Sequence, residues 1–402
     1  MGLALKERAG ESSESRAGET LADRIRSDRR LRWGIALAVL VFLVILPELF
    51  QPASPFVDHC VTALAYVVMA LGLNIVVGFA GLLDLGYVAF FAIGAYSAGW
   101  FASAFFAAIN GGKGFHLLAG SYVANQPGIH FNFLLVLVTA VVLTAIAGVI
   151  IGLPTLRLRG DYIAIVTLAF GEIVRVVAVN GQSIHLGHEA FLTAGRQGIT
   201  PIDSPQLPGL AAFDPLNLRP WYWTALVLVL IVLFVNYRVR DSRLGRAWIA
   251  IREDEIAAAS MGVPLVRTKL MAYATGAAFG GIAGAFLASY LNTVNADQFE
   301  FSFSIFVLAM IILGGIGNIL GVMIGAVVLS FVNVWLIPDV LHDLPHKIGL
   351  NFDLTELSFG IFGFLLVIMM VLRPEGLWPE RRRKMELTEG VGTDEALYEV
   401  RA

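Results

Sequence analysis

Two opposite charges lie three residues apart inside one of the apolar stretches of this chain. Glu172 and Arg175 belong to the apolar run 162–179, and a spacing of three places two side chains on one face of a helix. Charges in a membrane-length apolar segment are costly, and they usually pair and face a bundle interior or a water-filled path. The pair could neutralise itself and fix helix packing, or it could form a polar patch on the route of a zwitterionic solute.

A second polar set lies among glycines. Residues 72–86 place Asn74 and Asp84 beside four glycines within an otherwise apolar run. Discontinuous helices with free backbone groups often line the binding sites of transporters. The alternative is a tight turn in which Asp84 caps the following helix. The residues alone leave both interpretations open.

The third set lies in the segment 238–268, which is too charged to span a membrane. Residues 245–262 favour a helix, and Gly262 followed by Pro264 is a typical stop signal. A short amphipathic helix of this kind suits docking into a groove on a partner protein; the alternative is a solvated linker helix. The candidate contact residues for such docking are Arg246, Arg252, Glu253, Glu255, Ala257, Ala258 and Gly262.

Composition indicates which elements must position these residues. The chain is 57% apolar and 15% charged, whereas a soluble domain is about 45–50% apolar and about 25% charged. The net charge of −3 gives no basic field for nucleic acid. One cysteine, Cys60, excludes an internal disulfide and a multi-cysteine metal site. We expect an all-α bundle in a lipid bilayer, without a cofactor or a metal.

Hydropathy predicts ten membrane spans, because a spanning helix needs about 20 mostly apolar residues. They form a membrane domain over 33–375, between polar tails at 1–32 and 376–402 that are expected to be disordered. A large outer loop, 180–220, could form a small cap or a docking surface. The predicted spans are 34–50, 59–78, 86–108, 131–153, 162–179, 221–237, 269–292, 301–314, 318–337 and 356–372.

The distribution of basic residues tests this count independently. Lysine and arginine accumulate in cytoplasmic loops. With ten spans and both termini in the cytoplasm, the cytoplasmic segments and the adjoining edge of span seven hold 23 of the 28 lysines and arginines, and the outer loops hold four. Removing one span would place arginine-rich loops outside. The charge pattern therefore favours an even number of spans.

Five motifs in order carry a resemblance to a known family. They are Gly-Leu-Asn at 72–74, the run from Leu83 to Tyr96, Leu-Arg-Gly-Asp-Tyr at 158–162, Gly-Arg-Ala-Trp at 245–248 and Gly-Gly-Ile-Gly-Asn at 314–318. Together they resemble the LivM-type permeases of branched-chain amino acid ABC transporters, over about residues 33–375. The segment 255–262 is also similar to the coupling loop of ABC importer permeases, with Ile256 inserted between Glu255 and Ala257.

This resemblance implies a transport subunit of the bacterial inner membrane and a set of partner proteins. The implied partners are a second homologous permease of the LivH type, two ATPase subunits of the LivG and LivF type, and a periplasmic amino-acid-binding protein. The sequence has no Gly-x-x-x-x-Gly-Lys-Ser/Thr phosphate loop. We therefore expect no enzymatic activity in this chain and an ATPase on another one.

Two alternative functions remain at this stage. Permeases for urea or short amides are similar to this family, and a permease sequence discriminates poorly between cargoes because the binding protein selects them first. An ion-coupled secondary transporter would explain Glu172 and Arg175, but it would leave the segment 238–268 without a role. An intramembrane enzyme is disfavoured, because the spans contain no spaced His-Glu motif and no paired carboxylates.

Overall fold

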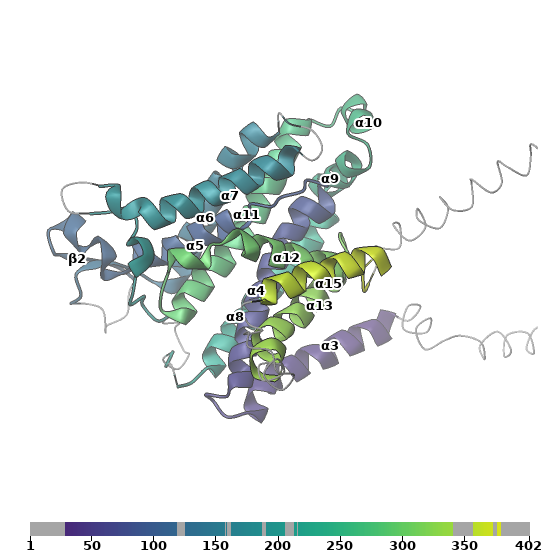
Figure 1. The fold of residues 1–402 in the computed structure, drawn as a ribbon. Coiled ribbons are helices and arrows are strands. Elements are labelled where there is room, and N and C mark those ends of the chain that lie inside the picture. Colours follow the sequence, from purple (N-terminus) through teal and green to yellow (C-terminus); the bar gives the residue numbers. More distant parts are fainter. Residues whose placement is uncertain are drawn as a thin grey trace, which may run out of the picture.

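The structure is a bundle of helices with a small sheet at one end (Figure 1). It is a computed structural model that describes residues 29–118, 125–156, 158, 162–186, 190–205, 213–214, 216–340, 357–372 and 376–378. The two tails predicted to be disordered lie almost wholly outside these residues. Apolar stretches form helices because a helix satisfies every backbone polar group within its own segment, which lipid requires.

Seven helical segments among the described residues are long and apolar enough to cross a membrane. Three shorter apolar helices accompany them: α3 (Arg29–Ile45) with η1 (Leu46–Leu49), α5 (Val88–Phe101) and α15 (Ser358–Leu372). Each of the ten predicted spans overlaps one of these ten segments, of which seven have the length of a candidate span. The seven are α4 (Pro55–Leu73) continuing as the π-helix η2 (Asn74–Phe79), α6 (Phe133–Thr155), α7 (Tyr162–Asn180), α8 (Arg219–Arg240), α11 (Leu265–Leu291), α12 (Phe301–Gly314) preceded by η7 (Ala296–Gln298), and α13 (Ile319–Phe331) continuing as η8 (Val332–Val340).

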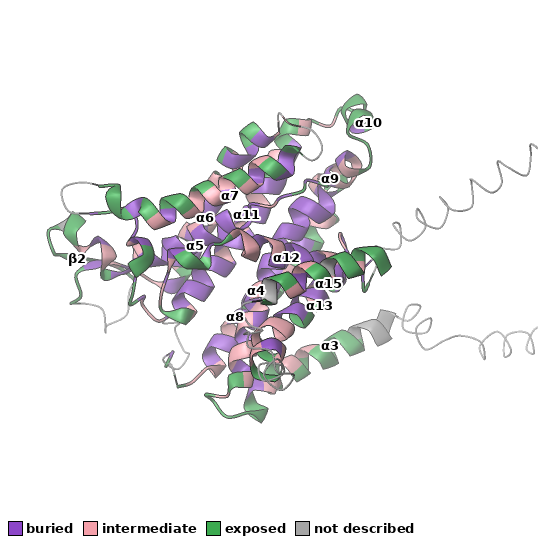
Figure 2. Cartoon of the chain, in the orientation of Figure 1, coloured by how far each residue is buried: buried purple, intermediate pink, exposed green. Residues whose placement is uncertain are grey.

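Helix α11 is the centre of the bundle and packs against α4, α5 and α6. Glycines allow this close approach. A Cβ atom at Gly94 would lie 2.3 Å from the carbonyl oxygen of Gly281, and one at Gly284 would lie 2.1 Å from that of Phe91. Small residues at helix contacts are the usual means of association in lipid, where hydrophobic burial gives no drive. Figure 2 shows the resulting contrast between the buried α4 and α11 and the exposed α3.

The expectation of an all-helical chain is wrong at one point, and so is the extent of the third span. Helix α5 ends at Phe101, and the chain continues through β1 (Ala102–Ser103), η3 (Ala104–Asn110) and β2 (Gly114–Leu117). Strand β3 (Gly128–Phe131) lies between them, antiparallel to β1 and parallel to β2. Residues 102–108 are nearly as apolar as the helix before them, so hydropathy extends the span through them. Hydropathy cannot detect that Ala102 and Ser103 pair with a strand some 25 residues later in the chain.

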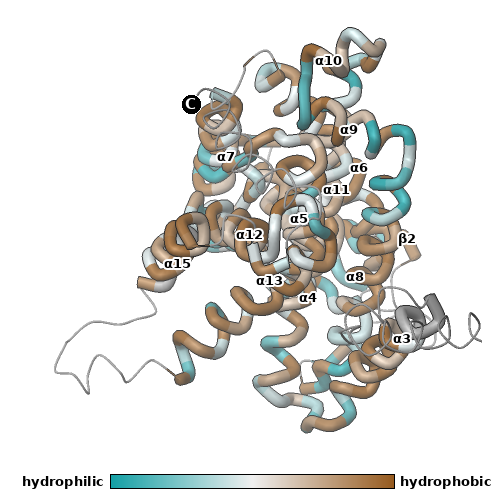
Figure 3. The backbone as a smooth tube through the Cα atoms, turned by 90° about the vertical axis from the view of Figure 1, so that its right-hand side faces the viewer, coloured by the Kyte–Doolittle hydropathy of each residue, from teal (hydrophilic) through white to brown (hydrophobic). Residues whose placement is uncertain are grey.

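Loops predicted for the same side of the membrane contact one another. At the end that carries the sheet, Ile199 pairs with Val294, and Ser103, which was predicted to lie in the third span, pairs with Ile202. At the opposite end, the loop after α8 contacts the end of η2, and the corner between α12 and α13 contacts the segment 376–378. These contacts agree with the two-sided distribution of lysine and arginine. Figure 3 shows hydrophilic residues gathered in loops at the helix ends, among them the loop that carries α9 and α10.

Candidate functional site

The loop expected to meet a partner protein contains two short helices, not the single helix predicted over 245–262. They are α9 (Arg243–Glu253) and α10 (Glu255–Ser260). The chain is extended at Asp254, with φ −152° and ψ 111°, and the Asp254 carboxylate accepts hydrogen bonds from the backbone N–H groups of Ile256 and Ala257 at 2.8 and 3.0 Å. Aspartate favours this N-cap position over a helix interior, and it therefore ends one helix and begins the next.

Helix α9 is packed onto the membrane domain. The Trp248 side chain is fully buried, and its indole N–H donates to the carbonyl oxygen of Thr268 at 2.7 Å. Arg252 donates from Nη1 to the carbonyl oxygen of Gly78, at the end of η2, over 2.6 Å. Arg246 donates within the loop, to the carbonyl oxygen of Asp241 at 2.8 Å. Arg252 therefore contacts its own chain, whereas the sequence suggested a contact with a partner.

Helix α10 is more exposed to the surroundings than α9. Ile256 and Met261 are 79% and 85% exposed, and α10 lies at the tip of its end of the molecule (Figure 1). Ala257 and Glu253 are exposed as well, whereas Ala258 is buried against the chain itself. This end of the loop thus presents large apolar side chains outside the bundle.

Two further candidate residues of this loop have structural roles within the chain. The Glu255 carboxylate forms a 2.8 Å ion pair with Nζ of Lys269, which is buried at the start of α11. Gly262 has φ +85°, and no atom lies within 4 Å of the position a Cβ would occupy. The glycine is therefore required by its left-handed backbone conformation, not by a close neighbour within this chain.

Asn74 and Asp84 lie on either side of the point where α4 and its continuation η2 end. Both are buried. Asn74 Oδ1 accepts a hydrogen bond from the backbone N–H of Gly317, at 3.0 Å, in the corner between α12 and α13. Asp84 Oδ1 accepts from the N–H of Gly86 at 2.9 Å, and its Oδ2 has no hydrogen-bond partner among the described residues.

Two other helices supply hydroxyl groups that accept hydrogen bonds from the backbone between η2 and α5. The Thr167 hydroxyl of α7 accepts from the N–H of Leu85, and the Ser304 hydroxyl of α12 accepts from the N–H of Val88, each at 3.0 Å. Ser304 thus caps α5, the role that the sequence suggested for Asp84. Thr167 and Ser304 were missed because isolated hydroxyl residues in apolar helices usually bond their own backbone and carry no motif.

Glu172 and Arg175 contact each other on α7. The Glu172 carboxylate accepts from Nη2 of Arg175 at 2.6 Å and from Nε at 2.9 and 3.0 Å. The side chains are 41% and 31% exposed, so they do not lie in the core of this chain. They lie on a side of α7 near η7 and the start of α12, where Asp297 and Glu300 add negative charge.

The end of the molecule that carries the sheet contains a second pair of ionisable side chains that the sequence did not indicate. Nδ1 of the fully buried His130 lies 2.6 Å from Oδ2 of Asp203, and the His116 ring stacks on that of His130. Burial raises the pKa of the Asp203 carboxyl above its usual value, and the hydrogen bond with His130 opposes this shift. The pair ties the loop 190–205 to strand β3.

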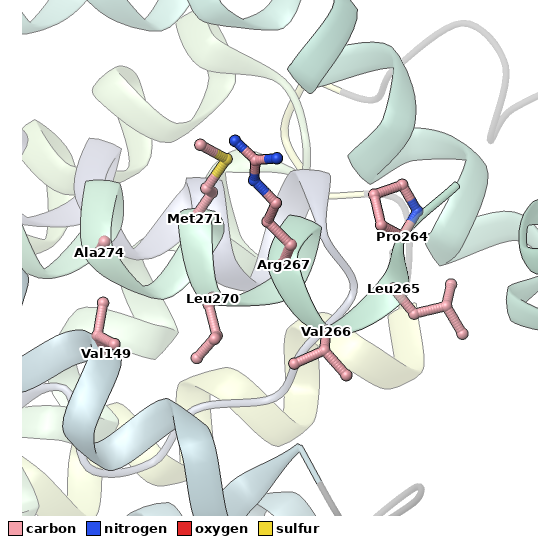
Figure 4. Close-up of a pocket in the computed structure, with 8 residues that line it drawn as sticks. All are labelled: Val149, Pro264, Leu265, Val266, Arg267, Leu270, Met271 and Ala274. Atoms are coloured by element: carbon pink, nitrogen blue, oxygen red, sulfur yellow. The ribbon is translucent and has the colours of Figure 1, made fainter. Parts of the chain in front are cut away.

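A cavity of about 600 Å³ lies beside the start of α11, between this helix and Val149 of α6 (Figure 4). Its lining is apolar except for Arg267. A zwitterion needs groups of both charges, and this lining supplies a cation alone. The cavity therefore does not match the chemistry of an amino-acid site. The lining residues are Val149, Pro264, Leu265, Val266, Arg267, Leu270, Met271 and Ala274.

Comparison with known proteins relates this arrangement to a family of transport proteins. A profile for the branched-chain amino acid transport system / permease component matches residues 56–370. That range includes the helix break, α9, α10 and the Glu172–Arg175 pair. No solved structure gives a significant match to the chain.

Several curated proteins are similar over most of the chain. The high-affinity branched-chain amino acid transport system permease protein LivM of Salmonella typhimurium is 37% identical over 88% of this chain and 76% of its own length. The LivM protein of Escherichia coli K12 is 37% identical over 89% and 78%. A probable LivM protein of Methanocaldococcus jannaschii is 26% identical over 79% and 91%. This multi-pass membrane chain therefore belongs to the family of permease components of branched-chain amino acid transport systems.

Proposed function

We propose that this chain is the LivM-type membrane subunit of an ATP-driven importer in a bacterial inner membrane, with leucine, isoleucine and valine as its cargo. The names of its relatives and the family match support this proposal. A periplasmic binding protein delivers the amino acid, and a homologous permease of the LivH type completes the path. Two ATPases of the LivG and LivF type supply the energy.

The exposed apolar tip of α10 is the observation that carries the assignment of the coupling loop. Large apolar side chains exposed in a helical span are covered by lipid, but a polar loop beyond the spans has no such cover. Ile256 and Met261 are each more than three-quarters exposed in such a loop. Exposed apolar groups rimmed by polar residues mark interaction sites, so we assign this tip to the ATPase.

Replacing the exposed apolar residues of the tip with charged ones tests the coupling assignment. Ile256→Asp and Met261→Asp should each lower ATPase co-purification or the ATPase stimulation by loaded binding protein about tenfold, because a desolvated contact is worth about 1.4 kcal/mol or more. Leu216→Asp is the matched control, since Leu216 is 72% exposed in the predicted outer loop. Normal co-purification and stimulation in both α10 variants would refute the coupling role.

Gly262 and Glu255 are less suitable positions for this test. Leucine at position 262 would carry backbone strain from φ +85° whether or not a partner touches it. Lysine at position 255 would face the buried Lys269. Either variant could lose activity without any contact with an ATPase, whereas the exposed Ile256 and Met261 can be changed without disturbing the bundle.

Ten spans with both termini in the cytoplasm form part of the proposal. The loop contacts at the two ends of the bundle support this topology, as does the distribution of basic residues. Cysteines introduced in the loop 190–205 should react with an impermeant thiol reagent in intact cells, and a cysteine at Ser242 should stay protected. The native Cys60 is buried and gives little background. Labelling at position 242 in intact cells would contradict the topology.

The Glu172–Arg175 face of α7 is assigned to the translocation path at the border with the second permease. Only 28% of the span that contains α7 is buried in this chain, against 83% for the span that contains α4. Half-exposed charges in such a span are costly against lipid and need a partner or water beside them. The nearby charges of both signs suit the ammonium and carboxylate groups of an amino acid.

Transport measurements separate the roles of this pair. Glu172→Gln and Arg175→Gln should each reduce leucine uptake in proteoliposomes by more than they reduce assembly with the second permease. A pair that only fixes packing would lose assembly and uptake together. Competition by excess urea in the same assay tests the cargo: uptake of leucine should persist, and its displacement by urea would favour the short-amide alternative.

A further inference from the structure

The contact between Arg252 and Gly78 connects the loop to the interior of the membrane domain. Arg252 lies in the last turn of α9, and its guanidinium donates to a carbonyl oxygen of η2. Its side chain fills the space beside Gly81, where a Cβ would lie 2.8 Å from Arg252 Cγ. Trp248 fixes the same helix to the start of α11, so α9 is attached to both η2 and α11, and a displacement of the loop bears on both.

The carbonyl group of Gly78 is available because η2 is a π-helix at a helix end. The last carbonyl groups of a helix lack an intrahelical partner, and here Ala80 and Leu82 donate to the carbonyls of Ile75 and Val76 instead. The Arg252 guanidinium donates to the carbonyl oxygen of Gly78.

One turn earlier, the same segment contacts the corner between α12 and α13. Asn74 accepts from the N–H of Gly317, whose φ of +88° belongs to the tight corner. A Cβ at Gly78 would lie 2.1 Å from Asn74 Oδ1 and 2.9 Å from the nitrogen of Gly317. Gly78, Asn74 and Gly317 therefore meet without free space, and closely packed groups transmit displacement instead of absorbing it.

We propose that Arg252, the π-helix Asn74–Phe79 and Gly317 form a relay that passes motion of the α9–α10 loop to the corner between α12 and α13. Arg252 is a positioning residue in this relay, acting on the path through Gly78 and Asn74, and the ATPase contact is made by α10. The relay rests on the proposed coupling function. It adds a route between the loop and the corner that joins α12 and α13.

The test uses the full transporter in nanodiscs or proteoliposomes, with both permeases, both ATPases and leucine-loaded binding protein. Arg252→Met keeps the side-chain stem beside Gly81 and removes the donor, and Asn74→Leu removes the acceptor at similar volume. Each should reduce leucine transported per ATP hydrolysed by about 5- to 30-fold, within the usual range of coupling between sites, while ATPase co-purification stays normal. Arg238→Met is the control, since Arg238 is an exposed arginine at the cytoplasmic end of α8.

The double variant distinguishes a relay from two separate defects. If both residues act in one chain of contacts, Arg252→Met with Asn74→Leu should be no worse than the more damaging single variant. Multiplied losses, or a transport-to-ATP ratio equal to that of the control in either single variant, would overturn the relay. This outcome is distinct from failure of the coupling assignment, in which the Ile256 and Met261 variants would keep normal stimulation.

A distance measurement keeps the test decisive if a variant assembles poorly. Spin labels at Ser260 and at the half-exposed Leu320 report the separation of α10 from the start of α13, and the buried Cys60 takes up little label. A non-hydrolysable ATP analogue should change this separation in the otherwise unaltered transporter. The change should be lost in the assembled fraction of Arg252→Met. A change of equal size in that fraction would overturn the relay.

Discussion

Helices α9 and α10 are neighbours in one loop, yet their apolar side chains lie in opposite environments. Trp248 and Ile251 of α9 are buried against the membrane domain, whereas Ile256 at the start of α10 and Met261 just after it are exposed. The polar groups attach both helices to the bundle, because Arg252 of α9 contacts η2 and Glu255 of α10 pairs with Lys269 of α11. The large apolar side chains of α9 are therefore packed against the bundle, and those at the two ends of α10 are presented beyond it.

This division gives the loop the two properties that coupling requires. A contact with a moving partner must be exposed, and it must also be rigidly attached to the elements it moves. Asp254 separates the two functions, because it ends α9 and begins α10 in a new direction. Substitutions in α9 and in α10 should therefore differ in their effects on stability.

The largest effect is expected at Trp248. Trp248→Ala removes a fully buried side chain and its hydrogen bond to Thr268, and loss of a buried aromatic side chain costs about 3–5 kcal/mol. The purified permease subunit, free of the ATPases, should lose thermal stability, measured as the melting temperature in detergent. Ile256→Ala is the matched variant on α10, and its effect should stay within about 0.5 kcal/mol. Equal effects at the two positions would contradict the division.

A smaller effect is expected for the ion pair that holds α10 to α11. Glu255→Gln leaves the buried Lys269 without its carboxylate. The loss should be roughly 1–2 kcal/mol, less than for a fully buried pair because the Glu255 side chain is 46% exposed. The double variant Glu255→Gln with Lys269→Met should recover most of the stability. A double variant less stable than Glu255→Gln would show that Lys269 does not depend on this partner.

The smallest effect is expected at Asp254. Asp254→Ala removes the cap of α10 and should cost about 1 kcal/mol, whereas Asp254→Asn keeps an acceptor. Hydrogen exchange at the amides of Ile256 and Ala257 should accelerate in the alanine variant alone. The two variants should differ in α10 and agree in α9, because Ser242 caps α9 independently. Faster exchange throughout both helices would mean that they form one cooperative unit.

Hydropathy and charge anticipated the helical segments because lipid makes length and apolarity decisive. They did not anticipate the end of α5 at Phe101, because residues 102–108 remain mostly apolar although Ala102 and Ser103 pair with β3 and the rest form η3. Nor did periodicity detect the break at Asp254. A helical repeat of side chains continues through a cap residue, and only the competition of the Asp254 carboxylate for backbone N–H groups reveals the break.

The sequence indicated several residues of the candidate site, but it did not indicate the contacts that these residues make. Sequence reasoning selected Asn74, Arg252 and Glu255 for their type and position, but their partners are backbone groups or residues far along the chain. The donors to Asn74 and Asp84 are N–H groups of glycines, which carry no side-chain signal. Burial likewise depends on packing, so the half-exposed position of Glu172 and Arg175 could not be derived from their spacing.

Site-specific cross-linking tests most directly whether α10 is the part that meets the ATPase. A photoreactive residue at position 256 or 261 in the assembled transporter should form covalent links to an ATPase subunit, and the yield should change when ATP is bound. The same residue at position 216, in the predicted outer loop, should form none. Absence of ATPase links from both α10 positions in a complex that still co-purifies would contradict the coupling role of this loop.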